Sequence, residues 1–566
     1  MFRLLLIATA LCAAEEARAE WNRAETSHFV IQADLSPVVL RGLATDLESI
    51  DALLRTITGV TAAQGRRRAE IAIFDQVSTV RRMASMPKFS GGITLYRELG
   101  SFVLVANDEA ERSGEYNVRR ALFHEYAHAF MRRFMPRPQP GWYVEGFATY
   151  FESCEILPDG HVRHGGFPLD IAGVFDAERH VNFEDVMSVS NNAIEGPPED
   201  RVYAFGWVLA HHYLSHAPRS AEIGHYLDAV GAARSVANAN GFFAGGVAAL
   251  DKDMSAYVKA LPPPREVALP PANPASVAIR AMRPGETALV QRRVTDLSLQ
   301  IRTDSKMSPI EQIRVTASYK AAQALFDKYP DERELGLYTG RLALFAGENK
   351  IADTIADRLL AADPENPDVL AFKANSLIAA TSHDVPKQFA TVIARGRALI
   401  QRAQAVDPDN ATAAEAMYRN YFMEQGSTPV TRRYLERAMQ LDPVNIRLRL
   451  RAVELALRVN DYRGVIALLE PIANSPHDTG ARTMAIEIIA GMRRRLSPPS
   501  PVARRGAAGR GTKPIVVPMP PMFVPAPPPP PRPATIVVTA PVSAPPARPV
   551  ASDKAKQGAT TKTTKR

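Results

Sequence analysis

The spacing of apolar residues in the first half of the chain predicts short strands and longer helices. Runs rich in Phe, Val and Ile predict strands over 28–33, 70–74, 92–96 and 101–106, the last two paired across a turn. Apolar residues at helical spacing predict helices over 37–57 and about 117–133, and a further helix from near Trp142. Strands followed by helices indicate an α+β domain, with a small sheet, over residues 20–261.

A different pattern begins near Ser308 and extends over residues 308–496. Ala, Leu and Tyr recur there at helical spacing, and prolines follow one another at intervals of 34, 44, 35 and 33 residues (Pro330, Pro364, Pro408, Pro443 and Pro476). Three of these prolines belong to the same phrase, Asp-Pro-x-Asn. The pattern predicts four or five helical pairs, one of them with an insertion, and a plain helical bundle is the alternative.

This period of about 34 residues, ending in a proline turn, resembles that of tetratricopeptide repeats. The resemblance covers about a third of the chain and implies an all-α solenoid that binds another protein. Pro262-Pro263-Pro264 marks the boundary before it, so residues 262–307 are expected to be a linker. Residues 497–566 are mostly Pro, Ala, Val, Thr, Arg and Lys and are expected to be a disordered tail.

The formal net charge of +8 is unevenly distributed along the chain. The stretch from Pro498 to Arg566 holds 11 Lys and Arg and one Asp, so it carries +10 and the remainder sums to −2. A nearly neutral folded part does not indicate nucleic-acid binding, and Phe523 is the one aromatic residue of the basic tail. The tail could instead contact anionic polymers or lipid surfaces of the cell envelope.

Residues 1–19 are expected to be a signal peptide. Arg3 is followed by a short apolar stretch, and Ala17-Arg18-Ala19 is a small-x-small cleavage site. We therefore expect export to the periplasm or the extracellular space. A lipoprotein signal at Cys12 is a weaker alternative, because the usual apolar-then-small run does not precede it. If Cys12 is removed with the signal peptide, Cys154 is the one cysteine of the mature chain. We expect it to be a small core residue, and a reactive thiol is the alternative.

His124-Glu125-Tyr126-Ala127-His128 is an HExxH motif on the helix expected at 117–133. Positions i and i+4 share one helical face, so His124 and His128 can bind one zinc ion. Zinc lowers the pKa of a bound water molecule, and Glu125 lies close enough to accept its proton as general base. The motif therefore predicts a metallopeptidase with one zinc ion per chain.

The block from Trp142 to Glu152 reads Trp-Tyr-Val-Glu-Gly-Phe-Ala-Thr-Tyr-Phe-Glu. With the HExxH motif, it resembles the gluzincins, especially the peptidase MA-like group, whose aminopeptidases carry a W-x-N-E-G-F-A-type sequence. The resemblance covers residues 21–261 and implies that Glu145 is the third zinc ligand. Val144 replaces the Asn of those aminopeptidases, and the spacing from His128 is slightly short, which argues against amino-terminus-specific cleavage.

Other residues compete for the third ligand position or could support the metal site. A metzincin would need Gly and a third His where this chain has Met131 and Phe134, so that class is excluded. His161 and His164, in a polar loop, remain alternative third ligands. Thr149 and Glu152 share a helical face with Glu145, so they are candidates to orient the histidines. The alternative for Glu152 is a side chain that simply faces solvent.

The gluzincin resemblance also implies an oxyanion donor from a later helix. Tyr203 matches that position, with a packing role as its alternative, and His211 or His212 could replace it. The strand at 101–106, expected at the edge of the sheet, would hold the substrate backbone by β-augmentation.

Two functions from different classes follow from these observations. The first is an exported zinc peptidase that cleaves peptides or proteins and recruits a protein partner through its repeats. The second is an envelope scaffold that acts through the repeats and keeps an inactive peptidase fold. Because His124, Glu125, His128 and Glu145 are all present, we favour the peptidase.

Overall fold

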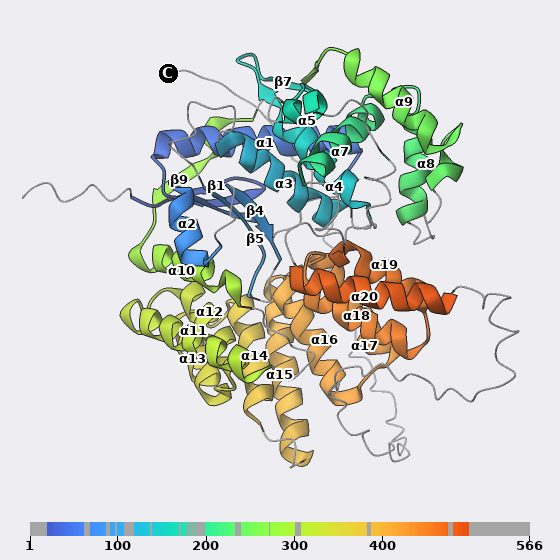
Figure 1. The fold of residues 1–566 in the computed structure, drawn as a ribbon. Helices are drawn as coiled ribbons and strands as arrows, with labels where there is room; N and C mark the ends of the chain where they lie inside the picture. Colours follow the sequence, from blue (N-terminus) through green and yellow to red (C-terminus); the bar gives the residue numbers. More distant parts are fainter. Residues whose placement is uncertain are drawn as a thin grey trace, which may run out of the picture. The chain divides into compact units, whose positions relative to one another are not determined.

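A mixed sheet of six strands lies at the centre of the N-terminal region (Figure 1). Its strands are β1 (Asn22–Glu25), β2 (Phe29–Ala33), β3 (Ala69–Phe74), β4 (Gly92–Leu95), β5 (Phe102–Ala106) and β9 (Ala278–Ala281). The spatial order is β4-β5-β3-β2-β1-β9. Strands β2, β3 and β5 are parallel, and the pairs β1–β2, β1–β9 and β4–β5 are antiparallel.

The structure is a computed structural model, and all residues it describes lie in one unit of the chain, 1–516. Among them, no helix has the length and apolarity needed to cross a bilayer. The signal peptide expected at 1–19 and the tail expected at 497–566 lie outside the described residues. The described ranges are 20–61, 68–86, 91–96, 99–106, 118–135, 139–168, 171–177, 183, 186, 199–231, 239–270, 272–299, 307–381, 386–473 and 479–496.

Helices cover both faces of this sheet, because successive side chains of a strand point to opposite faces. One face, which includes Ile31 and Ile73, packs in a common core with α1 (Pro37–Thr58) and α3 (Val118–Phe134). The other face, which includes Phe74 and Leu104, packs with α2 (Val77–Ala84) and α10 (Pro284–Thr295). The helix that carries the HExxH motif is therefore fixed against the sheet.

The described strand and helix positions confirm most of the elements expected in this half of the chain. In helix α1, local sequence features determine where the helix begins and ends. Ser36 accepts a hydrogen bond from the Val39 N–H, Pro37 lies in the first turn, and Gly59 ends the helix with a φ of +67°.

A second group of helices packs beside α3. It comprises α4 (Gly141–Glu152), α5 (Ala172–Ala177), α7 (Glu199–Leu214), α8 (Ser220–Gly231), the 3₁₀ turn η3 (Ala239–Phe242) and α9 (Gly246–Lys259). A three-stranded sheet of β6 (Glu155–Ile156), β7 (His161–His164) and β8 (Arg265–Ala268) lies in the same region.

The stretch 262–307 differs from the linker expected there. Strand β8 pairs with β7, β9 extends the central sheet beside β1, and α10 covers one face of that sheet. The short turn η4 (Pro274–Ser276) lies between β8 and β9, and the turn η5 (Asp296–Ser298) follows α10. Both strands have four residues and are largely exposed, so they lack the run of buried residues that would have revealed them in the sequence.

The edge of the sheet also differs from expectation. Strand β5 pairs with β3 on one side and β4 on the other, so the strand at 101–106 is not an edge strand. The outer position belongs to β4. Sequence could not separate these two strands, because each is short, apolar and adjacent to the other in the chain.

The C-terminal region is a solenoid-like series of antiparallel helices (Figure 1). Neighbouring helices pack in pairs, and α12, α14 and α16 also contact one another in succession, which stacks the pairs side by side. The helices are α11 (Pro309–Lys328), α12 (Arg333–Ala346), α13 (Asn349–Ala362), α14 (Pro367–Ala380), α15 (Pro386–Val406), α16 (Ala411–Gln425), α17 (Pro429–Leu441), α18 (Ile446–Arg458), α19 (Tyr462–Ala473) and α20 (Thr479–Leu496).

The Asp-Pro-x-Asn phrase separates consecutive pairs. Its Asn caps the next helix: Asn366, Asn410 and Asn445 each accept a hydrogen bond from the backbone N–H three residues on. The 21-residue helix α15 accounts for the long interval between Pro364 and Pro408.

Candidate metal centre

Helix α3 presents both histidines of the HExxH motif on one buried face. The exposed fractions of His124, Glu125 and His128 are 8%, 4% and 5%. The Nε2 atoms of the two histidines lie 3.1 Å apart, as the i, i+4 spacing predicts. Two imidazoles converge here inside the protein, away from bulk water.

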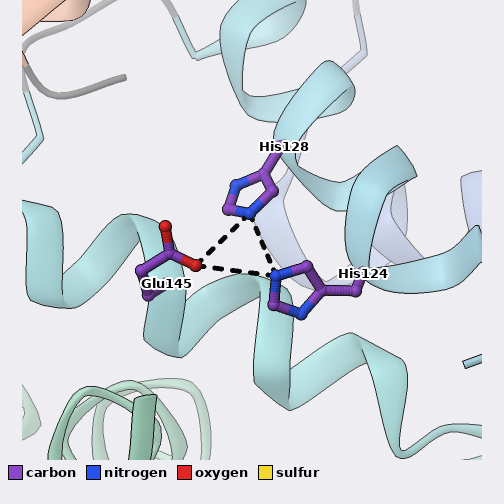
Figure 2. Close-up of side chains that lie close together, drawn as sticks. All are labelled: His124, His128 and Glu145. Atoms are coloured by element: carbon purple, nitrogen blue, oxygen red, sulfur yellow. Dashed lines mark hydrogen bonds and ion pairs between the residues drawn. The ribbon is translucent and has the colours of Figure 1, made fainter. Parts of the chain in front are cut away.

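Helix α4 brings Glu145 to the same point (Figure 2). Its Oε2 lies 3.5 Å from Nε2 of His124 and 3.4 Å from Nε2 of His128. With the 3.1 Å separation of the histidines, the three atoms form a nearly equilateral triangle. Among the described residues, this trio is the one group of three His, Cys, Asp or Glu side chains arranged to hold a metal ion.

The size and chemistry of this triangle fit a zinc ion. Ligands at about 2.0–2.1 Å from a tetrahedral ion lie about 3.3 Å from one another. The observed separations bracket that value, and two imidazoles with one carboxylate are a common catalytic ligand set for zinc. Both carboxylate oxygens of Glu145 are buried without a hydrogen bond from any described residue, which a coordinated cation would compensate.

The electrostatics of the trio keep the carboxylate ionised. Burial by itself raises the pKa of Glu145, but the charge and proximity of His128 and His124 lower it well below its ordinary value. For His124 the effect of burial has the opposite sign, because burial lowers the pKa of a histidine. The nearby carboxylates of Glu145 and Glu152 outweigh this effect and raise the pKa of His124 above its ordinary value. The pocket therefore favours positive charge at the point where the three side chains meet.

Glu152 orients the first histidine. Its Oε2 accepts a hydrogen bond from Nδ1 of His124 at 2.7 Å, and its Oε1 accepts one from Arg120 at 2.7 Å. A proton on Nδ1 leaves Nε2 of His124 as the lone-pair atom that faces Glu145. Thr149, the other orienting candidate, is buried, but its hydroxyl makes no hydrogen bond to a described residue.

Glu125 is held by strand β4. The Thr94 hydroxyl lies 2.8 Å from Oε2 of Glu125 and 2.7 Å from its carbonyl oxygen. A Cβ added to Gly92 would lie 2.7 Å from Cγ of Glu125, so only glycine leaves room for this carboxylate. Neither Gly92 nor Thr94 was singled out in the sequence, because nothing local marks a strand residue that contacts a helix 31 positions later.

Tyr203 lies beside the trio on α7. The centroid of its ring is 5.9 Å from that of His124. Helix α7 approaches α4 closely through two glycines: a Cβ on Gly146 would lie 2.0 Å from the carbonyl oxygen of Gly206, and one on Gly206 2.3 Å from that of Trp142. This contact sets the distance between the helix of Glu145 and the helix of Tyr203.

The alternative ligands and donors are engaged elsewhere. His164 pairs with the Tyr150 hydroxyl at 2.7 Å, and His161 lies 3.2 Å from Asp159. His211 contacts the Tyr257 hydroxyl and the Gly165 carbonyl, and His212 accepts a hydrogen bond from the Arg219 N–H. None of these four histidines belongs to the trio.

Cys154 is a buried free thiol at the end of α4. Burial raises its pKa well above the ordinary value, so it stays protonated at neutral pH. Of the two roles that the sequence left open for this cysteine, its surroundings support that of a small core residue.

Comparisons with known proteins add little to this picture. No protein-family model matches the chain, and no curated protein matches it. Among solved structures it is similar to a thermophilic TPR protein of Thermus thermophilus, at 16% identity and a TM-score of 0.28. That match covers 31% of this chain and 91% of the other.

Proposed function

We propose that the protein is a zinc-dependent peptidase whose metal ligands are His124, His128 and Glu145. One observation carries the proposal: the triangle of ligand atoms, with sides of 3.1, 3.4 and 3.5 Å, has the dimensions of one face of a tetrahedral zinc site. Side chains that met for packing alone would not leave both carboxylate oxygens of Glu145 buried without hydrogen bonds.

The residues around the trio divide the chemistry among them. Glu125 accepts a proton from the attacking water and returns it to the leaving amine. Thr94 orients the Glu125 carboxylate for this exchange. The bound zinc ion would acidify water and polarise the scissile carbonyl. Tyr203, whose ring lies beside that of His124, would donate a hydrogen bond to the developing oxyanion.

The substrate would approach along β4. This strand forms the edge of the sheet, and its Thr94 contacts Glu125, so an extended peptide paired with β4 passes the general base. The solenoid-like region would recruit a protein partner or the substrate itself. We also propose that the protein is exported to the periplasm or the extracellular space.

Metal content and peptide cleavage, measured together, test this function. The protein should contain one zinc per chain and cleave members of a diverse peptide library, and a chelator should abolish cleavage. Glu125→Gln should keep the zinc and lose about 10²- to 10⁴-fold in rate, the contribution typical of a general base. His124→Ala should lose both.

Glu334→Gln, on the exposed first turn of α12, serves as the control and should change neither quantity. Full activity in the Glu125→Gln protein would reject the role given to this residue. Purified protein without stoichiometric zinc would favour the alternative, an inactive scaffold that acts through its repeats.

A further inference from the structure

The last turn of helix α19 contacts the face of α3 that carries the candidate site. Arg132 follows Glu125 by seven positions and His128 by four, so all three share one helical face. The Arg132 guanidinium donates a hydrogen bond to the carbonyl oxygen of Pro471. This carbonyl lies in the last turn of α19, where carbonyl oxygens lack intrahelical donors and the helix dipole favours a cation. A charge-assisted hydrogen bond therefore joins the solenoid-like region to the motif-bearing helix.

Arg132 also links α19 to the end of β4. Its Cζ atom lies 4.7 Å from the centroid of the Tyr96 ring, and Tyr96 directly follows β4. The Tyr96 hydroxyl in turn donates to the carbonyl oxygen of His128 at 3.4 Å. One arginine side chain thus contacts both the solenoid-like region and the end of the strand along which a substrate would pair.

A second segment of the solenoid-like region lies close to β4. The turn between α17 and α18, residues 441–444, lines a cavity together with Thr94 and Leu95 of β4 and with Tyr126 and Phe130 of α3. This turn begins the third Asp-Pro-x-Asn phrase of the repeats. The repeats therefore approach the strand and the motif-bearing helix at two separate places.

Strand β4 is buried although it lies at the edge of the sheet. Thr94, Leu95 and Tyr96 are only 4%, 2% and 8% exposed. An edge strand ordinarily presents unpaired backbone groups to solvent, and β-augmentation requires access to those groups. The metal trio and Glu125 are buried as well. A peptide can therefore pair with β4 only after the elements that cover this strand have moved.

We propose that the last turn of α19 is an intramolecular lid, which keeps the peptidase inactive while Arg132 holds it against α3 and the end of β4. This inference rests on the proposed peptidase function and assigns its regulation to the repeats. A protein that binds the repeats and draws α19 away from α3 would open β4 to the substrate. The state that accepts substrate is then a minor one, and its population limits the observed rate.

Cleavage and hydrogen exchange, both measured on the full-length protein, test the lid. Arg132→Met keeps an unbranched stem but removes the positive charge and the hydrogen bond to Pro471. We expect this variant to cleave a diverse peptide library about tenfold faster than the wild-type protein, because losing one hydrogen bond from a charged group shifts a closed–open equilibrium by about that factor. Backbone amides of β4 and α19 should exchange with deuterium faster as well.

Two further variants complete the test. Arg119→Met is the matched control on α3: Arg119 lies in the first turn, is half exposed and forms an ion pair of 2.6 Å with Asp46, so it should change neither rate nor exchange. Arg132→Gln keeps a neutral donor and should raise the cleavage rate about threefold, since a neutral hydrogen bond is roughly half as strong as a charge-assisted one. It also tests the lid if circular dichroism shows that Arg132→Met does not fold.

Zinc-dependent cleavage that stays unchanged in folded Arg132 variants would overturn the lid and leave the proposed peptidase standing. Faster cleavage without faster exchange in α19 and β4 would also overturn it. If exchange in both elements becomes faster but neither the wild-type protein nor any variant cleaves peptides, α19 would be upheld as the cover of β4 and only the proposed function would be rejected.

Discussion

His124 is held from two sides: its Nε2 lies 3.5 Å from Oε2 of Glu145, and its Nδ1 lies 2.7 Å from Oε2 of Glu152. The carboxylate of Glu152 is itself fixed by an ion pair with Arg120, so rotation of the His124 ring would break its hydrogen bond to this carboxylate. Partners of this kind fix the tautomer of a metal-binding histidine and raise its basicity.

Glu152→Gln should therefore lower zinc affinity about 10- to 100-fold, the usual effect of losing such a partner. Titration with a fluorescent zinc chelator as competitor measures the change. Thr149→Val on the same helix is the control, because its hydroxyl bonds no described residue, and its affinity should stay within a factor of about two. An unchanged affinity in Glu152→Gln would show that this carboxylate does not position the histidine.

His212 makes the stability of the fold sensitive to acid. Its Nε2 accepts a hydrogen bond from the Arg219 N–H at 3.1 Å, which requires the neutral ring. Burial, with the charges of His211 and Arg219, lowers its pKa from 6.5 to about 4. Between these values the unfolded chain binds a proton that the folded protein excludes, so stability present above pH 6.5 is lost as the pH falls.

His212→Gln keeps an acceptor and removes the titration. The wild-type protein should lose stability between pH 6.5 and about 5 more steeply than this variant, by up to about 1.4 kcal/mol for each pH unit. Urea unfolding at several pH values measures the slopes. His225→Gln, an exposed histidine of α8, should keep the wild-type slope, and identical slopes in all three proteins would contradict the assignment.

At the scale of elements, the crossing of α4 and α7 sets the geometry of the site. Gly146 and Gly206 let the two backbones touch, which holds Glu145 at the distance it has from the histidines of α3. Any side chain at either glycine would overlap carbonyl oxygens that belong to the opposite helix.

Gly206→Ala should destabilise the protein by about 1–3 kcal/mol, because overpacked backbone contacts cannot relax without moving a helix. Zinc content should fall with it, since α4 carries Glu145. Gly42→Ala in α1 is the control: its added methyl meets no atom within 4 Å, so it should be neutral or slightly stabilising. Thermal unfolding and metal analysis check both variants, and a stable, zinc-loaded Gly206→Ala protein would contradict the role of this contact.

At the scale of the whole described molecule, α10 joins the sheet to the solenoid-like region. Its Val290 and Val294 pack with the sheet, and its Leu289 packs with the first repeat helices. Arg283 at its start forms two hydrogen bonds of 2.7 Å with Glu332, the residue that precedes α12. A helix shared by two cores couples their unfolding.

We therefore expect one cooperative unfolding transition for both regions. The three tryptophans, Trp21, Trp142 and Trp207, all lie before residue 262, so their fluorescence reports the N-terminal region, whereas far-ultraviolet circular dichroism reports mainly the many helices of the repeats. The two midpoints should coincide in urea. Separate midpoints in the wild-type protein would show that α10 does not couple the two cores, and Leu289→Ala should move the midpoints apart.

Local patterns in the sequence predicted much of the architecture. The helix at 117–133, the strands β2, β3, β4 and β5, and the repeat boundaries followed from local sequence patterns and from the Asp-Pro-x-Asn phrase, since these depend on residues a few positions apart. The pairing of His124 and His128 on one face follows from the same helical geometry.

Contacts between distant segments were decided only by the tertiary structure. The sequence did not reveal that β4 lies at one edge of the sheet and supports Glu125, or that β9 lies at the other edge. Periodicity identifies which face of an element is buried but not which partner covers it. That choice depends on packing among all the elements together, and at Gly92, Gly146 and Gly206 it depends on backbone approaches that leave no periodic pattern in the sequence.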